Sequence, residues 1–131
     1  MKKVIFFLSL MLMPLLCTAQ TYKFKTDSFA YKTNNNGRWS NWSDWEDSSM
    51  LVVINTDRDV ITIYSKETQE YDIVENLGTE KDREGGEQLK FLCVNEDGAR
   101  CHIRIRVQKD GQRQLYVDFS DIMFVYGITD R

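Results

Sequence analysis

The sequence predicts an all-β protein, a single antiparallel meander barrel of eight or nine strands. After residue 19, no segment has an apolar stripe with the 3.6-residue period of a helix, and short alternating runs recur instead. These runs are rich in β-branched and aromatic residues. The turns between them are too short for crossover helices, so the strands must be antiparallel. A closed barrel leaves no exposed strand edge, which favours it over a two-sheet β-sandwich, the alternative architecture.

Turn motifs divide the chain into nine expected strands. The motifs are "NNNG", "NTDRD", "NEDG" and "KDG", all rich in residues that favour tight turns. The charged, glycine-containing stretch 75–87 is expected to be a surface loop. The expected strands lie near 22–32, 38–45, 50–55, 60–65, 69–75, 88–94, 99–107, 113–119 and 122–128.

The first 19 residues have the pattern of a secretory signal peptide. Lys2 and Lys3 precede an apolar run over residues 4–16, and small residues lead up to Ala19. The apolar run is shorter than the roughly 20 residues that span a membrane. We therefore expect cleavage after Ala19, no transmembrane anchor, and one exported β domain over 20–131, located in the periplasm or outside the cell.

Charge and length restrict the function of this domain. Cleavage would leave 112 of the 131 residues, with 15 of the 17 basic residues against 20 acidic ones, a net charge of −5. Such an acidic chain is a poor nucleic-acid binder, because neutralising phosphates supplies most non-specific affinity. A domain of this size can bury a core without a metal.

The hairpin around residue 97 is the best-specified element. In "ARCHIRIRV" the odd positions are apolar and the even positions basic, and "QLKFLCV" alternates in the same way. A three-residue loop over 96–98, with Gly98 in the left-handed conformation, is a common hairpin form. The resulting register places apolar residues opposite one another: Leu89 with Ile105, Phe91 with Ile103, and Cys93 with Cys101.

This register predicts a disulfide between Cys93 and Cys101. Directly opposed residues have Cα atoms about 4.5–5.5 Å apart, which a disulfide tolerates, and an export compartment is oxidising. The alternative is two reduced thiols that pack as small hydrophobic side chains. Neither interpretation makes the pair redox-active, since no Cys-x-x-Cys motif is present.

No catalytic, metal or cofactor site can be identified from the sequence. His102 is the only histidine and has no serine or cysteine partner at a recognisable spacing. With two cysteines it does not form a known zinc pattern, and no phosphate-binding loop occurs. Acid–base pairs cannot be singled out among 20 carboxylates. Enzymatic activity is therefore not favoured, and a hydrolase is the weakest of the functional alternatives.

The outward-facing positions of the second hairpin strand form a basic stripe, Arg100, His102, Arg104 and Arg106. Alternating charge is normal on the outer face of an antiparallel sheet, where acidic residues on the next strand can balance it. The alternative is a site for an anionic partner such as a carboxylate, a sulfate or an acidic glycan.

Three tryptophans recur at a spacing of three in "WSNWSDWE". This stretch resembles the tryptophan ladder of thrombospondin type 1 repeats, where such rings interleave with arginines. The disulfide cysteines of that family are missing here, so we infer no membership. In a regular strand Trp39 and Trp45 would face one way and Trp42 the other. We expect Trp39 and Trp45 to anchor the core and Trp42 to contact a ligand, although an aromatic pair could also form a sugar-stacking platform or line the mouth of a barrel.

The chain as a whole resembles small exported proteins of Bacteroidetes to which no activity is attached. The resemblance is carried by "CTAQ", "WSNWSDWE", "VITIYSKETQEYDIV", "FLCVNEDGARCHIRIRV" and "QLYVDFSD", and it implies an envelope or secreted location. At the level of the fold, the expected barrel resembles the lipocalin group.

These observations predict an exported, non-enzymatic β-barrel that binds a small ligand, a glycan or an envelope partner. The alternative is an interaction module that uses tryptophan and arginine side chains on its outer face. A hollow interior would favour the first interpretation and a filled one the second. The candidate binding residues are Trp42, Trp45, Arg100, Arg104 and Arg106.

Overall fold

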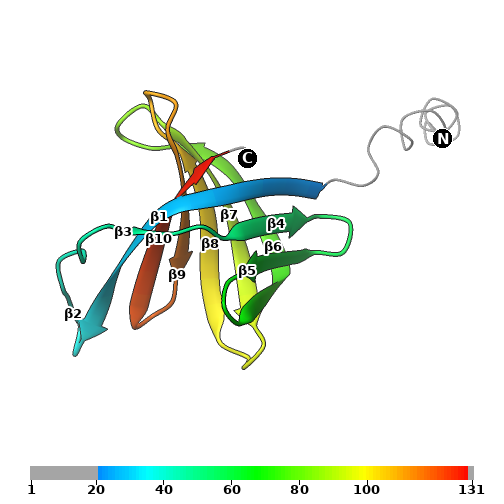
Figure 1. Cartoon of the computed structure of the whole chain (residues 1–131), viewed down its shortest axis with the longest axis horizontal. Coiled ribbons are helices and arrows are strands. Elements are labelled where there is room, and N and C mark those ends of the chain that lie inside the picture. The colour runs from blue at the N-terminus through cyan, green and yellow to red at the C-terminus, as the bar shows by residue number, and fades with distance from the viewer. Residues whose placement is uncertain (1–20, 130–131) are drawn as a thin grey trace, which may run out of the picture.

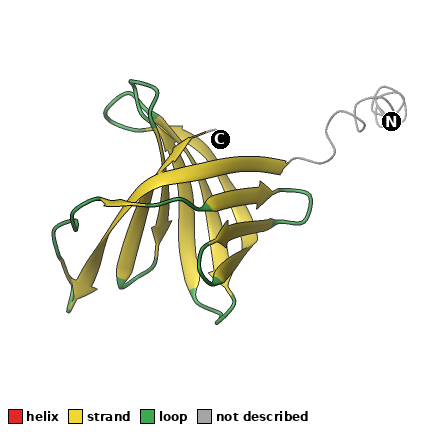
Figure 2. Ribbon diagram, viewed as in Figure 1, coloured by secondary structure: helices red, strands yellow, loops and turns green. Residues whose placement is uncertain are grey.

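The computed structural model describes residues 21–129, and in this range all regular secondary structure is strand (Figures 1 and 2). The predicted signal peptide lies outside the described residues. No helix in the described range is both long and apolar enough to cross a membrane. The strands are β1 (Thr21–Asn35), β2 (Arg38–Trp39), β3 (Glu46–Asp47), β4 (Leu51–Asn55), β5 (Val60–Tyr64), β6 (Thr68–Lys81), β7 (Glu87–Asn95), β8 (Arg100–Val107), β9 (Arg113–Asp118) and β10 (Ile122–Thr129).

Eight strands form a closed antiparallel barrel, which confirms the predicted meander. From β4 to β10 each strand pairs with the next along the chain, and β1 pairs with both β4 and β10. The short strands β2 and β3 add to the edge of β1 beyond β4. In Figure 1, β1 crosses the molecule obliquely and connects the two sides of the barrel.

The register of the β7–β8 hairpin is the predicted one. Leu89 pairs with Ile105, and Phe91 pairs with Ile103. Gly98 closes the turn with φ 85°, as the left-handed position of a three-residue loop requires.

The middle of the barrel is filled with side chains. The largest of the fully buried ones come from five strands and belong to one cluster. Such a core stabilises the closed sheet by removing apolar surface from water. These side chains are Phe91, Ile54, Ile61, Ile63, Ile103, Leu115, Val52, Val117 and Cys93.

Cys93 and Cys101 lie opposite each other as predicted, but both are free and buried, so the predicted disulfide is not formed. The backbone N–H of Asn95 donates to the carbonyl of Ala99 at 2.9 Å. Hydrogen-bonded and non-hydrogen-bonded pairs alternate along an antiparallel ladder, so Cys93 and Cys101, two positions from Asn95 and Ala99, are also a hydrogen-bonded pair. In such pairs the Cα atoms and the side chains are further apart than in the other kind. The prediction did not distinguish the two kinds.

The expected loop over 75–87 is also wrong, because β6 continues to Lys81. Two residues of β6, Val74 and Leu77, have no partner in the pairing with β7, so each forms a β-bulge. Their side chains are exposed, and Gly78 follows the second bulge with φ 85°. Each bulge shifts the alternation of inward and outward side chains by one residue. The apolar residues of this part of the sequence therefore do not recur at every second position.

Buried thiol and tyrosine hydroxyl groups make the stability of the fold sensitive to alkaline pH. Burial raises the pKa of Cys93 and Cys101 from 9.0 to about 12, and that of Tyr126 from 10.0 to about 12. The unfolded chain loses these protons at the ordinary pKa. The free energy of unfolding is therefore at its full value below about pH 9. It falls as the pH rises towards about 12, because the unfolded chain ionises while the folded chain keeps these protons. Urea unfolding followed by circular dichroism should show this decline, and a constant free energy of unfolding between about pH 9 and 11 would contradict it.

Candidate functional site

The tryptophan segment, residues 39–45, is not the regular strand predicted over 38–45. β2 ends at Trp39 and β3 begins at Glu46, and residues 40–45 between them have no regular secondary structure. This stretch nevertheless runs along the edge of β1 and is hydrogen-bonded to it.

Two serines replace the usual strand pairing. The backbone N–H of Ser40 donates to the carbonyl of Thr33 at 2.8 Å, and the Ser40 hydroxyl accepts from the N–H of Thr33 at 3.0 Å. Ser43 makes the same two bonds to Tyr31, at 2.8 and 3.0 Å. Each serine thus satisfies both backbone groups of one β1 residue. Three residues of the segment span two residues of β1, so the spacing of the serines matches the strand.

Because the repeat of three is matched to β1, the three tryptophans occupy equivalent positions. The Nζ of Lys32 lies 5.6 Å from the ring centre of Trp39 and 4.6 Å from that of Trp42. Lys32 pairs with Met123, which in turn pairs with Asp118, so the three side chains share one face of the sheet. Val117, next to Asp118, is buried in the core, so this shared face is the outer one.

Trp45 borders a concavity formed by outer-face residues, so all three rings lie on the outside of the barrel. We call Trp39, Trp42 and Trp45 the tryptophan row. The exposed fractions are 36%, 39% and 54%, respectively. The expectation that Trp39 and Trp45 anchor the core, with Trp42 facing the other way, is wrong because it assumed regular strand alternation.

Charged groups and rings alternate beside the tryptophan row. The edge of Trp42 contacts Tyr116, with ring centres 6.2 Å apart. The guanidinium of Arg104 lies 4.0 Å from the centre of the Tyr116 ring. Trp42 thus has both a cation and an aromatic ring as neighbours, and both contacts are favourable. These contacts favour one orientation of the ring on the outer face.

Two of the four members of the basic stripe, Arg104 and Arg106, are paired with carboxylates. Arg104 donates to both carboxylate oxygens of Asp118, at 2.6 and 3.4 Å. Arg106 donates to Asp82 at 2.8 Å and also pairs with Glu84. The hydrogen bond from Arg106 holds the pKa of Asp82 below its ordinary value. This geometry supports the balanced-face interpretation of the stripe over the anion site.

The two remaining members of the basic stripe, Arg100 and His102, are exposed. His102 pairs in register with Asp118 across the sheet. In residues 21–129 no group of three or more histidine, cysteine or acidic side chains could hold a metal ion. The predicted binding roles of the arginines remain predictions.

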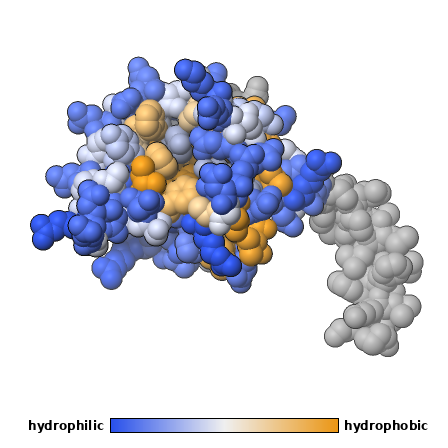
Figure 3. Space-filling model, turned by 90° about the horizontal axis from the view of Figure 1, so that it is seen from below, coloured by the Kyte–Doolittle hydropathy of each residue, from blue (hydrophilic) through white to orange (hydrophobic). Residues whose placement is uncertain are grey.

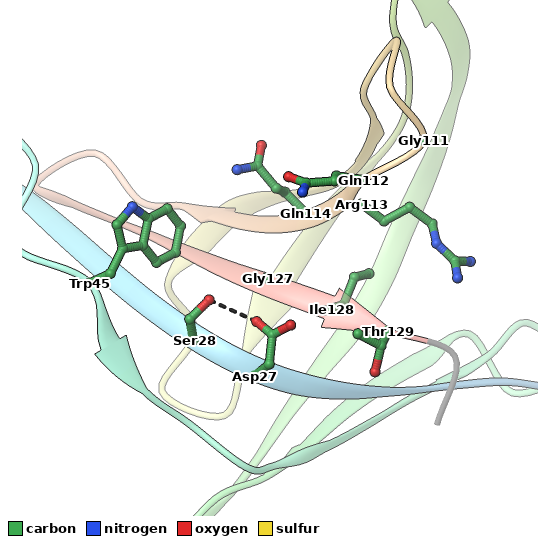
Figure 4. A pocket seen from close by; sticks show the side chains of 10 residues that line it. All are labelled: Asp27, Ser28, Trp45, Gly111, Gln112, Arg113, Gln114, Gly127, Ile128 and Thr129. Carbon is green, nitrogen blue, oxygen red and sulfur yellow. Dashed lines mark hydrogen bonds between the residues drawn. The ribbon is translucent and has the colours of Figure 1, made fainter.

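Trp45 forms one wall of an open concavity of about 590 Å³ (Figure 4). No sequence pattern pointed to its other residues, since they come from strands far apart in the chain. Figure 4 shows Trp45 at one end, Asp27 and Ser28 along β1, and the glutamines above Gly127. The lining residues are Asp27, Ser28, Trp45, Gly111, Gln112, Arg113, Gln114, Gly127, Ile128 and Thr129.

The ends of the barrel provide different surfaces. One end, seen from below in Figure 3, has apolar side chains at its centre and hydrophilic side chains around them. Elsewhere, an open and mainly apolar concavity of about 440 Å³ is lined by residues of β1, β4, β7, β8 and the second half of β6. We call it the apolar mouth. Its apolar lining residues are Tyr22, Phe24, Ile54, Leu89, Phe91, Ile105 and Val107.

Comparison with known proteins gave no match to a family model, to a curated protein or to a solved structure. The geometry of the chain itself is therefore the basis for a functional proposal.

The serine contacts can be tested by mutation. Replacing Ser40 or Ser43 with alanine removes the acceptor for one β1 amide, and the free energy of unfolding should fall by about 1 kcal/mol in each case. Hydrogen exchange at the amide of Thr33 should accelerate in S40A, and at that of Tyr31 in S43A. Ser49→Ala is the matched control, as Ser49 is exposed in the same connection. Unchanged exchange at both amides would contradict the assignment.

Proposed function

We propose that this protein is an exported, non-enzymatic binding protein whose tryptophan row binds an extended glycan. One observation supports this above all. Three tryptophans, partly exposed, lie on the outer face of the barrel, whereas the middle of the interior is filled by apolar side chains. The filled core favours the surface module over a barrel with an internal ligand.

The spacing of the row suits a polymer. Successive serine contacts advance two residues along β1, and two residues of an antiparallel strand span about 6.8 Å. Rings repeated at such a distance can contact successive units of a chain-like ligand. A glycan offers C–H faces that stack on aromatic rings and hydroxyls that bond to polar neighbours. Tryptophan combines a large apolar face with a hydrogen-bond donor, so it suits such a ligand.

The charge of the site also supports a glycan. Arg104 and Arg106 are engaged by carboxylates, and a further cation beside the row, Lys32, lies against the rings of Trp39 and Trp42. A polyanion would gain little from these arginines, because their partners already neutralise them.

Binding can be tested with alanine variants of the row. A glycan array should give at least one extended oligosaccharide that binds the mature protein. Trp42→Ala and Trp45→Ala should each weaken its affinity by about tenfold, equivalent to about 1.4 kcal/mol. Calorimetric titration provides the measurement.

The matched control is Tyr64→Ala, which removes an exposed aromatic ring from β5. It should leave the affinity unchanged. The proposal fails if no glycan binds, or if Tyr64→Ala weakens binding as much as the tryptophan variants do.

A second candidate function is binding of a small apolar ligand at the apolar mouth. The observation that favours it is a concavity with seven apolar or aromatic lining residues in a barrel whose middle is closed. Val107 lies at its margin and is 40% exposed. Val107→Arg would introduce a charge there and should abolish binding of an apolar fluorescent probe. An unchanged probe signal in this variant, or no probe signal in the parent protein, would remove this candidate.

A further inference from the structure

We infer that the concavity beside Trp45 is the subsite that selects a neutral sugar unit of the glycan. This inference rests on the proposed function and specifies its ligand. We call the five residues that carry it, Asp27, Ser28, Trp45, Gln114 and Gly127, the Gly127 notch. They come from β1, β9, β10 and the tryptophan segment, so the barrel fold assembles the subsite.

A bulge in β1 aims two consecutive side chains at the notch. Thr26 pairs with Ile128 and Ser28 with Gly127, so Asp27 is the extra residue. Consecutive side chains of a regular strand point to opposite faces. Here the Ser28 hydroxyl donates to the Asp27 carboxylate at 2.8 Å, which requires both to lie on one side. Bulges occur preferentially where a side chain has to be redirected, often beside functional sites.

Bonds from outside the notch hold the bulge. The N–H of Ser48 donates to the carbonyl of Asp27 at 3.1 Å. The hydroxyls of Thr26 and Ser48 lie 2.8 Å apart. Thr26 is buried, and its hydroxyl also accepts from the N–H of Met50 at 2.8 Å. These bonds hold the backbone of the bulge in place, and the Asp27 carboxylate is oriented by its bond from Ser28.

Gly127 forms the floor of the notch because it lacks a side chain. A Cβ at this position would lie 2.5 Å from the Asp27 carboxylate oxygen Oδ1 and 2.7 Å from the Ser28 Oγ. Its φ is not in the left-handed region. The backbone conformation therefore does not require glycine, but a Cβ here would displace the ends of the Asp27 and Ser28 side chains.

The walls of the notch offer a stacking surface and hydrogen-bond donors. Trp45 is the most exposed ring of the row, and no ring or cation contact to it is found in residues 21–129. Gln114 pairs with Gly127 in register. Its Oε1 accepts from the Tyr116 hydroxyl at 3.0 Å, which leaves its NH₂ group as a donor.

This combination fits a neutral sugar better than an acidic one. A carboxylate accepts hydrogen bonds from two hydroxyls, and a side-chain NH₂ donates to a third oxygen. The same carboxylate would repel a uronate or sulfate group. The nearby guanidinium of Arg113 lies over the Phe24 ring, 5.7 Å from its centre, and points away from Trp45 in Figure 4. Arg113 also lines the concavity, but the Gly127 notch itself contains one charged group, the Asp27 carboxylate.

The test compares neutral and uronate-containing oligosaccharides of equal length by calorimetric titration. Gly127→Ala should displace Asp27 and Ser28 and weaken neutral binding by about tenfold. Asp27→Asn should weaken neutral binding by about threefold and strengthen uronate binding, because the repulsive charge is gone. The matched control Asp72→Asn removes an exposed carboxylate from β6 and should change neither affinity.

Circular dichroism and the thermal midpoint establish that each variant is folded. If Gly127→Ala does not fold, Asp27→Asn alone decides the outcome, since its side chain is exposed.

The result separates the two proposals. If the tryptophan variants lose affinity while Asp27→Asn and Gly127→Ala keep the parent affinities for both ligands, the subsite is refuted and the binding role of the row stands. Tighter binding of the uronate-containing ligand by the unsubstituted protein would also refute the subsite and leave the binding role of the row standing. If neither ligand class binds, both proposals are refuted.

Discussion

The double pairing of β1 is the constraint on which the rest of the structure depends. One edge of this strand forms eight residue pairs with β10 and closes the barrel. The other edge pairs with β4 and then continues along the tryptophan segment. Along residues 25–33 this strand is therefore bonded on both edges. This part of the strand presents no edge that could pair with other molecules, and it positions Asp27, Ser28 and the tryptophan row.

The parts of the fold that follow a period of two could be predicted from the sequence. The register around Gly98 is correct because each strand there alternates without interruption. Prediction failed where the structure departs from that period. The second half of β6 was not predicted because of the bulges at Val74 and Leu77. The common orientation of the tryptophans was not predicted because it depends on the serine contacts. In each case an additional residue is absorbed locally, and no local pattern of apolar residues records it.

The candidate site was predictable only in part. Trp42 and Trp45 attract attention by their size and spacing, and both lie on the outer face. Gly127 lies 82 positions after Trp45, and Tyr116 lies 74 positions after Trp42, so the closed topology brings them together. Gly127 shows the difficulty most clearly. It is one glycine in an apolar strand, and its importance depends on two side chains of β1.

The serine contacts also give the outer face a modular character. Each Trp-Ser-x triplet corresponds to two residues of β1, and its serine bonds both backbone groups of one residue of that strand. The closure of the barrel depends on the pairing of β1 with β10 and, at residues 21–25, with β4. Adding or deleting one triplet together with two strand residues near the β1–β2 turn would therefore change the number of rings and leave the core untouched.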